Sequence, residues 1–166
     1  MWRANTLPTK DNCEAFVQEV ALADEAATRR LGARIAAHLM AGDVIALEGD
    51  LGSGKTTLAR AILAALGVGE SVPSPTFTLV QHYDTPGLAI DHFDLHRITD
   101  ETELDQLGLE DVLAGGAALV EWPERAGARL PPSTLQVRLE IIGENERCVR
   151  IAGSTRWASA FGDSRS

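Results

Sequence analysis

The chain has 166 residues, which corresponds to about one domain at the roughly 150 residues typical of a single core. Hydrophobic residues make up 45% and charged residues 23% of the sequence, and these average values exclude a disordered or fibrous protein. The formal net charge is −9, with 24 acidic and 15 basic residues. Clustered Lys and Arg side chains are what hold nucleic-acid backbones, so this chain is not expected to grip nucleic acid tightly by itself. We expect one domain over residues 1–155 and a partly disordered C-terminal tail over 156–166.

The cysteines and the apolar segments indicate the cellular compartment. Cys13 and Cys148 are the only cysteines, and their spacing predicts neither a zinc site nor a disulfide framework. No apolar run approaches the ~18 residues of a membrane span, and the first residues lack the apolar core of a signal peptide. We therefore expect a cytoplasmic protein with no membrane association.

The first part of the chain alternates between strand and helix patterns. The expected elements are a strand over 13–20, a helix over 26–40, a short buried strand over 43–48, and an apolar helix over 55–66. Asp24 is a suitable N-cap for the first helix, and Gly42 and Gly67 end the two helices.

The later part predicts two hairpins around one more buried strand. The first hairpin joins 77–83 to 88–94 through Asp84-Thr85-Pro86-Gly87, and the second joins 135–142 to 147–151. Between them we expect one or two short helices over 100–113 and a strand over 117–120 that ends at Glu121. Residues 71–75 contain two prolines and predict an extended loop, and Trp157 is expected to dock the tail on the body.

A phosphate-binding motif stands between the second strand and the second helix. The segment GDLGSGKTT (Gly49–Thr57) matches G-x-x-x-x-G-K-[ST] in full. Glycines let the backbone N–H groups turn inward around a phosphate, and the start of the helix adds positive potential. Lys55 is expected to reach the β- and γ-phosphate oxygens, and the Thr56 hydroxyl to ligate Mg²⁺. The residues expected to bind the nucleotide are Gly49, Asp50, Leu51, Gly52, Ser53, Gly54, Lys55, Thr56 and Thr57.

This motif and its flanks predict the fold class and the nucleotide. We expect an α/β fold, a P-loop NTPase-like three-layer domain with a mixed, mainly parallel central sheet and β-hairpins. Lys10 and Lys55 are the only lysines, and neither lies in the Asn-Lys-x-Asp pattern that reads guanine. ATP with Mg²⁺ is therefore the expected cofactor.

A P-loop also needs a carboxylate at the end of a neighbouring buried strand. Glu121 follows the apolar run Ala118–Val120, and Asp94 and Asp91 lie in the strand over 88–94. Side chains alternate along a strand, so Asp94 shares a face with His92 and His96, whereas Asp91 points to the other face. Asp94 is thus preferred to Asp91 as a catalytic carboxylate, although the sequence fits equally well the alternative that both aspartates only cap a strand end. Two histidines at i and i+4 on a strand lie too far apart to bind one metal ion.

Five segments in order resemble the bacterial TsaE family. They are GDLGSGKTT, SPTFTLV (74–80), HFDLHRI (92–98), LGLEDVL (107–113) and VEWPER (120–125). Members of that family are P-loop ATPases required for the threonylcarbamoyl modification of adenosine in certain tRNAs. The resemblance implies partners, a TsaD-like threonylcarbamoyl transferase and its TsaB-like paralogue, that handle the tRNA, so this chain meets tRNA only indirectly.

The resemblance also assigns roles to individual residues. It implies that Lys55, Asp94 and Glu121 are catalytic and that Thr56 and Glu121 hold the magnesium ion. Thr76 matches a threonine of a switch-like loop near the γ-phosphate. Trp122 matches an aromatic neighbour of the magnesium site at Glu121 and is expected to belong to the cofactor-binding residues. His96 stands where the family signature has tyrosine, so any hydrogen bond of that ring hydroxyl is either made by His96 or missing.

Two other classes of function fit a single P-loop domain. A small-molecule kinase would usually carry an arginine-bearing lid, and residues 100–116 contain no arginine. A non-catalytic, ATP-gated binding module would clamp a partner without hydrolysis. Since no arginine in the sequence is an obvious finger for hydrolysis, we expect a Mg-dependent ATPase that is slow alone and stimulated by its partners.

Overall fold

The computed structural model describes residues 15–69 and 79–161. In chain order the elements are β1 (Ala15–Leu22), α1 (Glu25–His38), β2 (Val44–Glu48), α2 (Lys55–Ala65), β3 (Val80–Thr85), β4 (Leu88–Asp94), α3 (Thr102–Leu107), α4 (Leu109–Leu113), β5 (Gly116–Glu121), the 3₁₀ segment η1 (Pro123–Arg129), β6 (Leu135–Ile141), β7 (Arg147–Ser154), the 3₁₀ turn η2 (Thr155–Trp157) and α5 (Ala158–Phe161).

The strands form one mixed sheet with β2 at its centre. The seven strands lie in the order β1-β7-β6-β2-β5-β4-β3. The pairings β6–β2, β2–β5 and β5–β4 are parallel, whereas β1–β7, β7–β6 and β4–β3 are antiparallel. The expected mixed sheet with β-hairpins is therefore confirmed: β6, β2, β5 and β4 run parallel, and the outer parts are built from hairpins and the returning β1.

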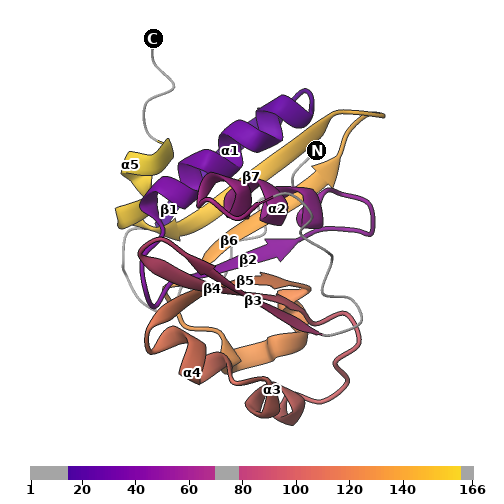
Figure 1. The fold of residues 1–166 in the computed structure, drawn as a ribbon. Helices are drawn as coiled ribbons and strands as arrows, with labels where there is room; N and C mark the ends of the chain where they lie inside the picture. Colours follow the sequence, from indigo (N-terminus) through magenta and orange to yellow (C-terminus); the bar gives the residue numbers. More distant parts are fainter. Residues whose placement is uncertain (1–14, 70–78, 162–166) are drawn as a thin grey trace.

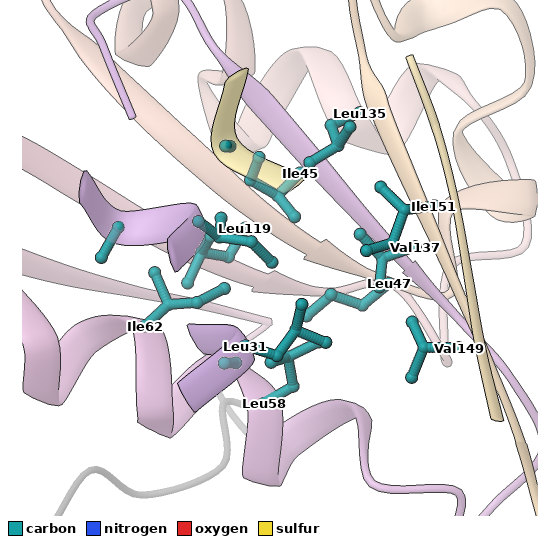
Figure 2. Packing of buried hydrophobic residues seen from close by; sticks show 14 of the residues in the cluster. Leu31, Ile45, Leu47, Leu58, Ile62, Leu119, Leu135, Val137, Val149 and Ile151 are labelled. Atoms are coloured by element: carbon teal, nitrogen blue, oxygen red, sulfur yellow. The ribbon is translucent and has the colours of Figure 1, made fainter. Parts of the chain in front are cut away.

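Helices cover both faces of the sheet and make three layers (Figure 1). Along β2, Ile45 and Leu47 face α1 and α2, while Val44 faces the side of α3 and α4, as the alternation of side chains along a strand requires. Figure 2 shows Leu31, Leu58 and Ile62 of the helices packed toward side chains of the sheet. On the opposite face, a smaller core includes Phe93, Val120 and Leu104.

Local sequence explains most element boundaries. Helix α1 begins after Asp24, whose Oδ1 accepts a hydrogen bond from the Ala27 amide at 2.8 Å, as the predicted N-cap should. Gly67 has φ 94°, a left-handed conformation that ends the run of α2. The expected short helices over 100–113 are the two helices α3 and α4, and the two predicted hairpins are β3–β4 and β6–β7. The strand expected over 13–20 runs from Ala15 to Leu22, and η1 was not predicted at all.

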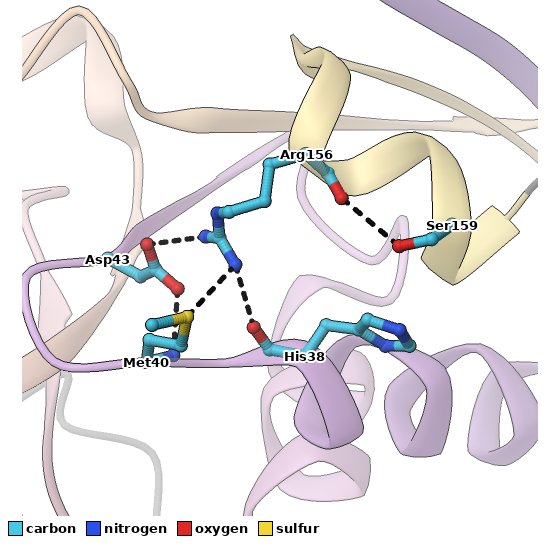
Figure 3. Close-up of polar contacts among 5 residues, drawn as sticks. All are labelled: His38, Met40, Asp43, Arg156 and Ser159. Atoms are coloured by element: carbon cyan, nitrogen blue, oxygen red, sulfur yellow. Dashed lines mark hydrogen bonds and ion pairs between the residues drawn. The ribbon is translucent and has the colours of Figure 1, made fainter.

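The segment after β7 is fixed to the body of the domain. Trp157 is 1% exposed and belongs to the main core, which confirms that it docks this part of the chain. Arg156 bonds to the Asp43 carboxylate at 2.6 Å and to the His38 carbonyl at 2.9 Å (Figure 3). Residues 155–161 are therefore tied to the end of α1 and the start of β2.

No helix within residues 15–69 and 79–161 has the length and apolar character that crossing a membrane needs.

Candidate functional site

The predicted phosphate loop connects the central strand β2 to α2. Gly49, Gly52 and Gly54 adopt φ values of 147°, 82° and 106°, which side-chain-bearing residues rarely adopt. A Cβ on Gly49 would lie 2.5 Å from Ser53 Oγ and 2.6 Å from the Leu139 carbonyl oxygen. The loop therefore depends on glycine for its backbone conformation and, at Gly49, for space.

Lys55 is a buried cation at the first turn of α2. Lys55 is only 5% exposed. Its Nζ donates to the Gly49 carbonyl and, at 3.3 Å, to the Asp50 carbonyl. Nζ also lies 3.8 Å from the centre of the Trp122 ring, a cation–π contact. Burial lowers the pKa of the Lys55 ammonium from its ordinary value, and the negative charges of Glu121, Glu124 and Asp94 partly offset this effect.

Glu121 connects the start of α2 to β4. Its Oε1 accepts a hydrogen bond from the Thr56 hydroxyl at 2.7 Å, and its Oε2 lies 2.7 Å from His92 Nε2. Burial by itself raises the pKa of Glu121, but the hydrogen bond and charge of His92, the Thr56 hydroxyl and the nearby Lys55 hold that pKa below its ordinary value. The carboxylate is therefore ionised at neutral pH although Glu121 is only 2% exposed.

The ends of β4 and β5 bring the two predicted carboxylates to one place. Asp94 and Glu121 are register partners on these parallel strands, and both are buried. Their common face is the one that carries His92, as alternation predicts. Asp91 lies on the other face, where its carboxylate contacts His82 Nδ1 on β3. The structure thus places Asp94, and not Asp91, beside the phosphate loop.

His96 does not lie on the strand, contrary to the sequence-based expectation. Strand β4 ends at Asp94, and the Asp94 carboxylate accepts a hydrogen bond from the His96 amide at 3.0 Å. The chain therefore turns before His96, and its ring lies 5.2 Å from the Trp122 ring, centre to centre. Trp122 itself has φ 58°, so the backbone turns sharply directly after Glu121 and brings this indole over Lys55.

Two contributions to the site were missed in the sequence. His92 is fully buried and bonds to Glu121, a contact that its place on the Asp94 face of the strand did not by itself indicate. Arg147, at the start of β7, bonds to the carbonyl oxygens of Gly52 and Ser53 in the phosphate loop. No local sequence pattern indicates the role of Arg147, because Ser53 and Gly52 lie 94 and 95 residues before it in the chain. Leu51 and Thr57, which were also predicted to bind the nucleotide, have exposed side chains, and Thr76 lies outside the described residues.

Comparisons with known proteins identify the family of the chain. A family model described as threonylcarbamoyl adenosine biosynthesis protein TsaE matches residues 22–149. The chain belongs to the TsaE family. Its relative from Aquifex aeolicus is 41% identical over 138 residues, which cover 82% of this chain and 96% of the relative. The Bacillus subtilis relative is 40% identical over 121 residues, covering 72% of this chain and 75% of the relative.

A solved structure supports the same fold. The crystal structure of Bacillus subtilis YdiB superposes with a TM-score of 0.75 at 28% identity, covering 90% of this chain and 94% of that one. Together with the strand–loop–helix geometry at Gly49–Thr57, this likeness confirms the P-loop NTPase fold, and the membership of the TsaE family confirms the resemblance seen in the sequence.

Proposed function

We propose that this chain binds ATP with Mg²⁺ at the phosphate loop and hydrolyses it, as a subunit required for the threonylcarbamoyladenosine modification of tRNA. The observation that carries the proposal is the 2.7 Å hydrogen bond between Thr56 and Glu121 next to the buried Lys55. A nucleotide-bound magnesium ion needs a hydroxyl and a carboxylate, here Thr56 and Glu121, and the phosphates need a cation, here Lys55. The hydrogen bond brings these groups together.

The residues of the loop fit a phosphate group. The backbone around Gly52 and Gly54 has the left-handed turns that let successive N–H groups converge. Ser53 Oγ is buried and has no hydrogen-bond partner among the described residues, so a polar ligand would satisfy it. Lys55 Nζ would exchange its bonds to the loop carbonyls for bonds to phosphate oxygens. These groups would bind and orient the triphosphate.

The carboxylates of Glu121 and Asp94 fit magnesium binding and the hydrolysis step. Thr56 and Glu121 offer oxygen ligands, which Mg²⁺ prefers, and the bound ion would neutralise charge that develops on the phosphates. His92 fixes the orientation of Glu121 through its 2.7 Å contact. Asp94, the register partner of Glu121, would accept the proton of the attacking water. Trp122 would pack against the nucleotide once Lys55 has turned toward the phosphates.

The partners follow from the family and from charge. With a net charge of −9 this chain is poorly suited to hold tRNA, so we assign that task to a TsaD-like transferase and a TsaB-like paralogue. A partner can also supply the positive charge that accelerates hydrolysis by about 10³–10⁵-fold in related systems. The chain alone would therefore turn over slowly.

The decisive experiment is tRNA modification in vitro with the two partner proteins, ATP and either wild type or Lys55→Ala. We expect the Lys55→Ala chain to lose both ATP binding and modification, while Arg34→Ala, which removes an exposed cation on α1, keeps both. Modification that proceeds unchanged with Lys55→Ala would refute the proposal.

A second variant separates hydrolysis from mere clamping of the partners. Asp94→Asn should bind ATP and the partners but fail to support repeated modification, because the side-chain amide can still accept the hydrogen bond from the His96 amide but cannot take up the proton of the attacking water. Full modification by Asp94→Asn would instead favour an ATP-gated module without hydrolysis. ADP formation that requires a small acceptor molecule would identify a kinase.

A further inference from the structure

We propose that Arg147 is a positioning residue that fixes the phosphate loop from the outside, through the turn between β6 and β7. This inference rests on the proposed nucleotide binding and adds a residue to it that is far from the motif in sequence. Arg147 belongs to the first residue pair of the β6–β7 hairpin, opposite Ile141. Its side chain reaches away from the hairpin to the loop between β2 and α2.

The guanidinium group contacts two consecutive carbonyls of the phosphate loop. Nε donates to the Ser53 carbonyl at 3.1 Å and Nη2 donates to the Gly52 carbonyl at 3.3 Å. These two nitrogens form one edge of a rigid planar group, so the spacing of the two carbonyls is set by the geometry of arginine. A lysine has the charge but lacks this edge.

The other side of the guanidinium is held by the hairpin itself. Nη1 donates to the carbonyls of Gly143 at 3.2 Å and Glu146 at 3.0 Å. The turn is closed by a hydrogen bond from the Ile142 amide to the Glu146 carbonyl at 3.2 Å. The guanidinium group of Arg147 is therefore held on both sides by backbone carbonyls, those of the phosphate loop and those of the hairpin turn.

The direction of these carbonyls decides where the loop amides point. In a trans peptide unit the C=O and the next N–H point in opposite directions, and the described residues contain no cis peptide bond. Holding the Gly52 and Ser53 carbonyls toward Arg147 turns the amides of Ser53 and Gly54 away from it. The Ser53 amide also donates to the Asp50 carbonyl at 3.0 Å, so the Gly54 amide is the group that Arg147 would preorganise for a phosphate before the nucleotide arrives.

A glycine-rich backbone has many alternative conformations in the nucleotide-free state. Bonds from Arg147 restrict these conformations, so the loop loses less conformational entropy when a nucleotide binds. Gly52 and Gly54 are the residues with the greatest freedom in the loop, and a Cβ at Gly52 would meet nothing within 4 Å. Neighbouring packing therefore does not hold Gly52 in place; the turn bond from the Ser53 amide to the Asp50 carbonyl and the bonds to Arg147 do. Loss of Arg147 should increase the motion of this loop and weaken nucleotide binding.

The test compares Arg147→Ala and Arg147→Lys with Arg150→Ala, which removes a half-buried arginine three residues further along β7. In the nucleotide-free chain, we expect faster amide hydrogen exchange at Ser53 and Gly54 in both Arg147 variants and no change in Arg150→Ala. The KM for MgATP should rise about tenfold in Arg147→Ala with a much smaller effect on kcat, since the ground-state phosphate site is loosened. Arg147→Lys should recover little of this loss.

Each contrary result has a distinct meaning. Wild-type exchange and KM in Arg147→Ala would overturn the inference, and so would full recovery by Arg147→Lys, since the charge alone would then be enough. If Arg147→Ala does not fold, as thermal unfolding would reveal, the Arg147→Lys measurements decide. If the wild type binds no nucleotide, the proposed function fails, whereas amide exchange in the free chain still tests the positioning of the loop.

Discussion

The hydroxyl of Thr56 donates a hydrogen bond to Oε1 of Glu121 at 2.7 Å across 65 residues of sequence. Thr56 lies in the first turn of α2, and Glu121 is the last residue of β5. Strand β5 is parallel to β2, so the carboxyl end of β5 meets the loop that leaves β2. This is the position at which open α/β sheets bind ligands.

Replacing the carboxylate at this position should uncouple nucleotide binding from magnesium. Glu121→Gln keeps an oxygen that can accept the Thr56 hydrogen bond but removes the negative charge. We expect the increase of ATP affinity that Mg²⁺ produces in the wild type to shrink by about tenfold or more, while metal-free binding stays similar. Calorimetric titrations with and without Mg²⁺ measure both quantities. Glu140→Gln, an exposed residue of β6, is the matched control and should behave as wild type.

The contact between α1 and α2 leaves no room for a side chain at Gly32. A Cβ there would lie 2.6 Å from the Cβ of Ala61, although alanine is the better helix former by about 1 kcal/mol. Because overpacking of a core typically costs about 1–3 kcal/mol, we expect Gly32→Ala to lower the free energy of unfolding. Urea denaturation tests this.

The compensating change on the facing helix provides the check. Ala61→Gly should recover part of the stability lost in Gly32→Ala, since it removes the opposing Cβ. Gly115→Ala is a control because its Cβ would meet nothing within 4 Å. A Gly32→Ala chain that is more stable than the wild type would contradict the packing seen here.

Arg156 should stabilise the domain by fastening the segment after β7. Its guanidinium bonds to Asp43 and His38 and lies over the Trp157 ring, with Cζ 4.4 Å from the ring centre. The Arg156 side chain is 39% exposed, so we expect Arg156→Ala to lower the free energy of unfolding by only about 1 kcal/mol. Arg29→Ala breaks an ion pair between two well-exposed side chains and should have a smaller effect in the same urea titration. Equal stability of the two variants would mean that Arg156 does not fasten this segment.

His82 makes the β3–β4 hairpin sensitive to pH. Its hydrogen bonds to Asp91 and Asp84 raise the pKa of His82 above its ordinary value of 6.5. A raised pKa in the folded state means that the added stability is fully present below pH 6.5 and is lost as the pH rises through the folded pKa. The His82 side chain is 57% exposed, so the effect should stay below about 1 kcal/mol.

The measurement compares wild type with His82→Gln. The difference in their unfolding free energies should decrease between pH 5 and pH 9, approximate limits chosen to bracket the ordinary histidine pKa. An NMR titration of the His82 ring gives its pKa directly. A ring pKa at or below the ordinary value would refute the role of the two aspartates.

The elements with continuous local signals were predictable. The N-cap at Asp24, the phosphate loop and the two hairpin turns are each encoded by a few adjacent residues, and the structure has them where the sequence places them. The mixed sheet with hairpins was also expected, but its strand order was not predicted, because that order depends on how hairpins add to the edges. The segment η1 has no periodic apolar pattern, and its sharp backbone turn begins at Trp122 with φ 58°.

In the candidate site, the glycine turns, Lys55 and Thr56 could be recognised from the sequence alone, since they follow one another along the chain at the spacing that the loop requires. The sequence also limited the candidates for the neighbouring carboxylate to Asp91, Asp94 and Glu121, near the ends of two predicted strands. Only the tertiary structure placed Asp94 and Glu121 side by side, set His92 against Glu121, and brought Arg147 to the loop carbonyls. These contacts join positions 27 to 95 residues apart, and they depend on the register of parallel strands and on the path of a returning hairpin, which no local pattern specifies.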